Sequence, residues 1–154
     1  MAGIIETRLA ELGIELPEAP APVANYMPYV KTGNLVVLSG QVTIWNGELK
    51  YIGKIGEDLS VEQGAEAARM CALNLIAQVR AACDGDLDRV KRVVRLGAFV
   101  NAVPDFTEHP QVVNGASDLM VEVFGDRGRC ARTNAGSTLP LGFAVEIDGI
   151  FEIE

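Results

Sequence analysis

The chain has 154 residues, of which 49% are hydrophobic and 22% charged, proportions typical of an ordinary globular domain. Its net charge of −8 argues against general affinity for nucleic acid, because that affinity depends on Lys and Arg displacing counterions from phosphates. We therefore expect one hydrophobic core that needs neither disulfides nor a metal to fold, in a protein that does not bind nucleic acid.

The first 23 residues predict a short helix followed by an extended connector. Ile5 and Leu9 recur at helical spacing, and Gly13 suits the end of such a helix. Three prolines follow, and their fixed φ angles and missing N–H donors favour an extended chain. We therefore divide the sequence into an N-terminal helix with a proline-rich connector, residues 1–23, and a main domain, residues 24–154.

Two β-hairpins are predicted next. Residues 27–31 and 35–39 have strand composition and are separated by a short turn that contains glycine. Asn46-Gly47 is a two-residue turn signal, because both residues tolerate the positive φ angles of a type I′ turn. We expect the strands of the second hairpin at residues 42–45 and 50–52.

The remaining sequence predicts two long helices and further strands. Ser60 begins a Ser-x-x-Gln capping box, after which apolar and small residues recur at helical spacing up to Cys83. Residues 93–100 are mostly β-branched and apolar and predict a buried strand, and a second helix is expected to start near residues 105–110. From Phe143 onward, apolar odd positions alternate with mostly acidic even ones, as in a strand with one buried face.

Together these elements predict an α+β fold, in which two long helices cover one face of a single mixed sheet and a short N-terminal helix is added. The second face of such a sheet has no helix to cover it. We expect another subunit to cover it, because oligomerisation is a common solution for an open sheet face.

The cysteines and the single histidine argue against a metal site. Cys71, Cys83 and Cys130 lack the spacing of metal ligands, and their odd number favours reduced thiols in a cytoplasmic protein. The N-terminal residues do not resemble a signal peptide, and no apolar run reaches the length of a membrane span. His109 is expected at a helix start and cannot form a multi-histidine site within one chain.

Three side chains are candidates for function, each with a simpler alternative. The guanidinium of Arg132 suits a paired grip on a carboxylate, and the simpler alternative is an ordinary surface arginine. Glu146 is expected on the uncovered face of the last strand, where it is either functional or simply solvated. Cys130 is a candidate reactive thiol, because the nearby charge of Arg132 would lower its pKa, or else a bystander.

Several segments in order resemble the Rid family, the reactive intermediate deaminases, which are also described as YjgF-like proteins and formerly as L-PSP endoribonucleases. The resemblance covers about residues 24–154. Without the short proline motif after Gln41, and with its N-terminal helix, the chain is similar to a divergent branch of that family. The segments that carry the resemblance are Asn34–Gln41 (NLVVLSGQ), the strand at 93–100 with Asp105-Phe106, Val113-Asn114, Ala131-Arg132-Thr133, and Leu139-Pro140 with Val145–Asp148.

The resemblance implies a chorismate-mutase-like fold and a homotrimer with three clefts between its subunits. It implies that Arg132 holds a substrate carboxylate, that Glu146 positions a water molecule, and that Tyr26 and Asn114 help to bind the substrate. The stretch from Arg132 to Pro140 is one residue shorter than is usual in the family, which changes the expected wall of the cleft.

The resemblance also implies an activity. A reactive enamine or imine derived from an amino acid would be hydrolysed to a 2-oxo acid and ammonia without a cofactor, as by a 2-iminobutanoate/2-iminopropanoate deaminase. The partners expected are therefore a small carboxylate-bearing imine or 2-oxo acid and two further copies of the chain. The alternatives are a non-catalytic trimeric protein that binds small carboxylates and an endoribonuclease, and the acidic charge argues against the latter.

Overall fold

The computed structural model describes residues 2–21 and 24–154; Met1 and residues 22 and 23, which belong to the predicted connector, lie outside the described residues. Three short 3₁₀ turns, Leu87–Arg89, Gly125–Gly128 and Pro140–Gly142, separate some of the main elements. The main elements in chain order are α1 (Ile4–Glu11), β1 (Tyr29–Thr32), β2 (Leu35–Gln41), β3 (Ile44–Trp45), β4 (Glu48–Leu49), α2 (Val61–Ala82), β5 (Val90–Val100), α3 (His109–Phe124), β6 (Ala131–Gly136) and β7 (Val145–Ile153).

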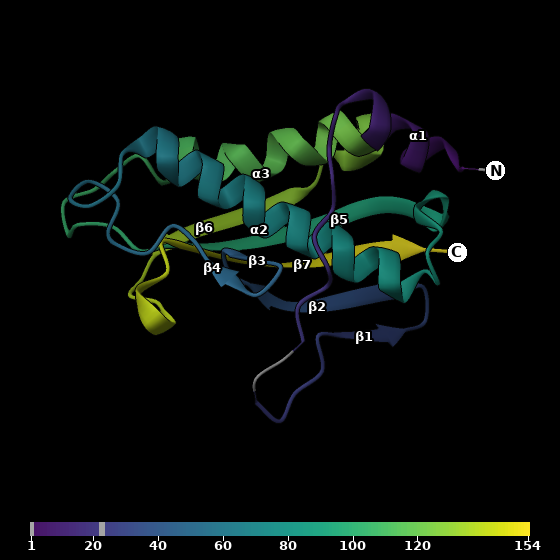
Figure 1. Ribbon diagram of the computed structural model, residues 1–154, viewed down its shortest axis with the longest axis horizontal. Coiled ribbons are helices and arrows are strands. Elements are labelled where there is room, and N and C mark those ends of the chain that lie inside the picture. Colours follow the sequence, from purple (N-terminus) through teal and green to yellow (C-terminus); the bar gives the residue numbers. More distant parts are fainter. Residues whose placement is uncertain (1, 22–23) are drawn as a thin grey trace.

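Five of the strands form one mixed sheet in the order β1-β2-β7-β5-β6. Neighbouring strands are antiparallel except for β5 and β6, which run parallel because α3 crosses back over the sheet between them. The helices α2 and α3 lie side by side on one face, as Figure 1 shows. The predicted α+β fold is thus confirmed, and His109 is the first residue of α3, as expected.

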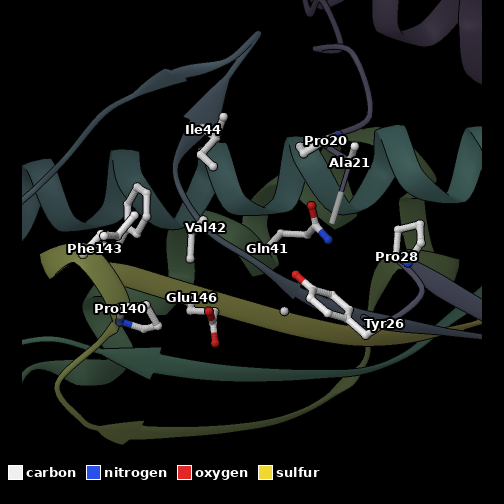
Figure 2. Close-up of a pocket in the computed structure, with 12 residues that line it drawn as sticks. Pro20, Ala21, Tyr26, Pro28, Gln41, Val42, Ile44, Pro140, Phe143 and Glu146 are labelled. Atoms are coloured by element: carbon white, nitrogen blue, oxygen red, sulfur yellow. The ribbon is translucent and has the colours of Figure 1, made fainter. Parts of the chain in front are cut away.

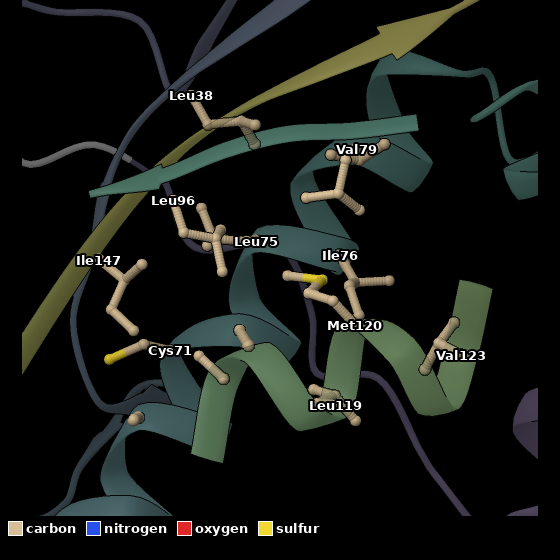
Figure 3. Close-up of a cluster of buried hydrophobic side chains, with 14 of the residues drawn as sticks. Leu38, Cys71, Leu75, Ile76, Val79, Leu96, Leu119, Met120, Val123 and Ile147 are labelled. Carbon is tan, nitrogen blue, oxygen red and sulfur yellow. The ribbon is translucent and has the colours of Figure 1, made fainter. Parts of the chain in front are cut away.

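The core fills the space between the two long helices and the sheet (Figure 3). Small residues let the helices approach closely, since a Cβ atom at Gly115 of α3 would collide with the carbonyl oxygen of Ala65 in α2. Each Val, Leu, Ile or Met side chain buried here gains roughly 1.5–3 kcal/mol relative to exposure. The residues of the predicted stripes that are completely buried are Ala68, Ala72, Leu75, Ile76, Val79, Val112, Val113, Leu119 and Met120.

The second hairpin is shorter than predicted, and the prediction of a strand at residues 50–52 is wrong. Asn46 and Gly47 have φ angles of 49° and 86°, as the predicted turn requires. A two-residue turn pairs the residues directly beside it, so Trp45 faces Glu48 and the strand begins there. Tyr51 then adopts a φ of 51°, which ends the extended conformation.

The second face of the five-stranded sheet is not covered by any element of the described residues (Figure 1). Val30, Val37 and Phe99 expose apolar side chains on it, although Phe99 belongs to an interior strand. Arg95 and Asp148 form an ion pair of 3.3 Å on the same face. A mixture of exposed apolar groups with charges suits a surface that meets another protein chain.

Within residues 2–21 and 24–154, no helix has both the length and the apolar character needed to cross a membrane.

The predicted capping box of α2 is present in both directions. The Ser60 hydroxyl accepts a hydrogen bond from the Gln63 backbone N–H at 3.1 Å, and the Gln63 side chain accepts one from the Ser60 N–H at 2.9 Å. Two N–H groups at the start of the longest helix are therefore satisfied.

Replacing Ser60 with Ala should lower the free energy of unfolding by about 1 kcal/mol, because the first turn of α2 loses its cap. Urea denaturation at a fixed protein concentration measures this loss. Ser137→Ala is the control, since that hydroxyl bonds only the adjacent Thr138 carbonyl among the described contacts. Equal losses in the two variants would contradict the role of the cap.

Candidate functional site

A pocket opens where β2 bends away from β7. The register between these strands slips between Leu38 and Gln41, so that β2 carries one residue more than its partner over this stretch. Gly40 lies in the bulge, and the Glu146 carboxyl group packs against it: a Cβ atom at residue 40 would lie 3.0 Å from the Glu146 Cδ. The bulge and the missing side chain at Gly40 make room for this carboxyl group.

The pocket has a volume of about 230 Å³, which suits a small metabolite rather than a large cofactor. Figure 2 shows Tyr26, Gln41 and Glu146 around it, with Pro20 and Ala21 close to α2. Two of the predicted site residues, Tyr26 and Glu146, are thus brought together. The lining residues are Pro20, Ala21, Tyr26, Pro28, Gly40, Gln41, Val42, Ile44, Pro140, Leu141, Phe143 and Glu146.

Glu146 is half-buried, and its pKa is raised above the ordinary value of 4.5. Removal from water is the larger cause, because burial disfavours the charged form, and the negative charge of Asp148 on the same strand face adds to it. A carboxyl group with a raised pKa can exchange protons closer to neutral pH than a solvated one. Of the two alternatives for Glu146, a simply solvated carboxylate does not describe this environment.

Arg132 does not line this pocket. It is the second residue of the edge strand β6, and its Nη1 donates hydrogen bonds to Asn114 Oδ1 at 2.9 Å and Ser117 Oγ at 3.0 Å. Both acceptors are on α3, one turn apart. The predicted residues Arg132 and Asn114 therefore form a second cluster, in which α3 fixes the orientation of the guanidinium.

The two clusters lie on opposite sides of the sheet. Arg132 is in register with Leu96, which is completely buried beneath the helices. Glu146 is in register with Phe99, which is exposed on the uncovered face. Because side chains alternate across a sheet, a single chain does not bring the Arg132 and Glu146 side chains together.

Cys130 is half-buried beside the second cluster. Burial raises the pKa of its thiol, and the positive charge of Arg132 lowers it by a smaller amount, so the net shift is upward. Arg132 thus lowers the pKa of this thiol as predicted, but burial outweighs that effect. The raised pKa nevertheless disfavours the thiolate form that a reactive cysteine requires.

Several residues of the site were not predicted. Ser117 shares the Arg132 contact with Asn114, and its spacing of three residues on a helix could have indicated it. Gln41, Asn74 and Gln78 are buried amides at positions that face the core. A polar residue at a core-facing position of an apolar pattern is the signal that could have found them.

Among the described residues, no group of three or more His, Cys, Asp or Glu side chains is arranged to hold a metal ion. The polar groups of the two clusters are instead an arginine, amides, hydroxyls and a carboxyl group. Such a set can bind an anion and transfer protons.

Replacing Glu146 with Gln should raise the free energy of unfolding at pH 8, because folding raises the pKa of the carboxyl group and the native state therefore bears a cost when it is ionised. This gain should fade as the pH falls below about 4.5, where the group is protonated with or without folding. Urea unfolding at pH 8 and pH 4 measures it. Glu152→Gln, on the same strand face but outside the pocket, is the control; an equal gain there would contradict the prediction.

Comparison with known proteins gives the relationship of the whole chain. Residues 6–144 match the family model described as "YjgF/chorismate mutase-like, putative endoribonuclease". Protein TCP17 of Trypanosoma cruzi is 47% identical over 154 residues, which cover 99% of this chain and 96% of that protein.

Solved structures agree with this match. The Agrobacterium tumefaciens protein Atu1372, described as of unknown function, is 46% identical with a TM-score of 0.91, and the match covers 97% of this chain and 92% of that one. A "putative endoribonuclease" from Shewanella oneidensis is 38% identical with a TM-score of 0.94, covering 98% and 100%. RidA from the Antarctic bacterium Psychrobacter is more distant, at 28% identity and a TM-score of 0.60, covering 88% and 94%. The match over most of the chain, together with these relatives, means that this protein belongs to the YjgF/RidA family.

Proposed function

We propose that the protein hydrolyses reactive 2-imino acids, and the enamines in equilibrium with them, without a cofactor. Water adds to the imine carbon, the C–N bond breaks, and the products are a 2-oxo acid and ammonia. No electrons are transferred, so no oxidant or reductant is needed. The reaction requires a group that binds the carboxylate and a group that moves protons between water and nitrogen.

The observation that carries the proposal is the geometry of Arg132. Nη1 uses its hydrogens on Asn114 and Ser117, whereas Nη2 and Nε have no acceptor in the described part of the chain. These two nitrogens form one edge of the guanidinium, which matches the two oxygens of a carboxylate. Arg132 would therefore bind the substrate carboxylate, while the contacts with α3 hold the side chain in position.

Glu146 supplies the second requirement. As a carboxylate it would accept a proton from the attacking water, and as a carboxylic acid it would return that proton to the departing nitrogen. The raised pKa supports this double role, since both forms are then accessible nearer to neutral pH. Tyr26 and Gln41 would add hydrogen-bonding groups from the same pocket.

The complete site would need two subunits. Arg132 and Glu146 lie on opposite sides of one sheet, so the arginine cluster of one chain would complete the pocket of a neighbour. The uncovered sheet face with Val30, Val37 and Phe99 supports an assembly, because burying these side chains removes apolar surface from water. We propose a homotrimer with three equivalent sites, as a closed ring of this kind requires.

Replacing Arg132 with Ala should reduce the release of 2-oxo acid and ammonia at least about 100-fold, because the substrate carboxylate is no longer held near Glu146. The imines are generated in place by an amino-acid oxidase, and the accelerated rate is compared with the rate without protein. Arg129→Ala, which removes an exposed arginine outside both clusters, is the control. Full activity of Arg132→Ala would overturn the assignment, and binding of 2-oxo acids by the native protein without turnover would indicate a binding protein instead.

Mixing two inactive variants tests whether each site draws on two chains. When Arg132→Ala and Glu146→Gln subunits are dissociated and reassembled together in equal amounts, about a quarter of the sites of a ring should combine an intact arginine with an intact glutamate. Activity should then return to about that fraction of the native value, although each variant alone stays inactive. If both residues acted within one chain, no mixture would recover activity.

A further inference from the structure

The N-terminal helix α1 is firmly attached to the main domain. The Asp88 carboxylate accepts hydrogen bonds from the backbone N–H groups of Ile4 and Ile5, both at 2.9 Å, and these bonds lower the pKa of Asp88. Gly3 lies so close to this carboxylate that a Cβ atom there would collide with it. Ile5 and Leu9 are only 3% exposed and belong to the common core.

From α1 the chain continues as an extended segment, residues 14–21, which we call the strap. It crosses α2 on the way to the sheet, as the purple trace in Figure 1 shows. Pro17 is buried, and the backbone N–H of Glu18 donates to Asn46 Oδ1 at 2.8 Å. Gln78 of α2, itself 2% exposed, donates from Nε2 to the Pro20 carbonyl at 2.7 Å.

A second buried amide lies one turn earlier on α2. Asn74 donates from Nδ2 to the carbonyl oxygens of Val42 at 3.0 Å and Ile44 at 2.8 Å. Its Oδ1 has no hydrogen-bond partner among the described residues. A buried oxygen without a partner lowers the stability of the fold. Asn74 and Gln78 therefore hold the backbones of two walls of the pocket, and one helix sets the distance between those walls.

Both walls are apolar. The strap contributes Pro20 and Ala21, and the other wall contributes Val42 and Ile44, with Phe143 beside it. The polar side chains that line the pocket are those of Tyr26, Gln41 and Glu146. A ligand that reacts beside Glu146 would thus extend its remaining part between two apolar surfaces.

We propose that this pocket selects 2-imino acids with bulky apolar side chains, branched aliphatic or aromatic, and that Ala21 of the strap limits the size of the side chain. The inference rests on the proposed function and adds the class of substrate. A methyl side chain would leave most of the space between the walls unfilled, whereas a larger apolar group gains by leaving water. Gln78 is then a positioning residue that acts through the strap.

The experiment compares imines made in place from leucine and from alanine, with the ratio of their kcat/KM values as the readout. The native protein should prefer the leucine-derived imine by at least about tenfold. Ala21→Phe fills the space between the walls and should abolish this preference, chiefly by slowing the larger substrate. Ala19→Phe places the same side chain on a part of the strap that does not line the pocket and should leave the ratio unchanged.

Gln78→Met provides a second variant. It keeps the length of the side chain but removes the hydrogen bond to the Pro20 carbonyl, so the wall should lose its fixed position and the ratio should fall. General damage to the fold would lower kcat/KM equally for both substrates and leave their ratio unchanged. A native ratio near one, or an Ala21→Phe ratio equal to the native one, would overturn the inference while leaving the proposed hydrolysis standing.

Binding distinguishes the inference from the function on which it rests. Dissociation constants for 4-methyl-2-oxopentanoate and pyruvate are measured by calorimetry for the native protein, for Ala21→Phe and for Ala19→Phe. If no imine is hydrolysed, the proposed function fails, yet tenfold tighter binding of the larger acid, lost in Ala21→Phe alone, would still support the apolar pocket. Equal binding of the two acids, or binding of neither, would overturn it.

Discussion

Helices α2 and α3 cover only one face of the five-stranded sheet, and this one-sided burial governs where every candidate functional group lies. Strand side chains alternate between the two faces, so neighbouring strands divide their polar residues between a helix-covered side and an open side. Arg132 contacts α3 on the first side, and Glu146 borders the pocket on the second. The same constraint that builds the core therefore separates the two clusters within each chain.

The helix α2 has two tasks in this arrangement. Its apolar residues fill the core, and two buried amides on it bind backbone carbonyls of the pocket walls. Buried amides are costly unless their hydrogen-bonding groups are satisfied, and Asn74 leaves its Oδ1 without a partner among the described residues. An apolar side chain at that position would leave the Val42 and Ile44 carbonyls without the Asn74 donor, so the amide is explained by its bonds to that wall.

The Glu146 carboxyl group also carries a cost to stability. A carboxyl group removed from water, and close to Asp148, destabilises the folded state when it is ionised. The bulge in β2 and the absence of a side chain at Gly40 accommodate the group without forcing it into solvent. Perturbed carboxyl groups in pockets are typical of sites that transfer protons.

The sequence by itself determined the elements and the fold class, because these depend on local signals. The capping box at Ser60 marks the start of α2. The apolar spacing of α2 and α3 and the alternation after Phe143 indicate which side of each element faces the core. The predicted strand at residues 50–52 was wrong, because the two-residue turn at Asn46-Gly47 sets where the second strand of the hairpin begins. The strand composition of residues 50–52 does not decide it.

Only the tertiary structure decided how the candidate residues are grouped. Tyr26 and Glu146 border one pocket, whereas Arg132 and Asn114 form another cluster. The spacing of these residues along the chain does not indicate which of them lie together. It follows from the order of strands in the sheet, which pairs β5 with both β6 and β7 and sets their registers. The attachment of the strap to Gln78 is likewise a contact across 58 residues, which local patterns cannot encode.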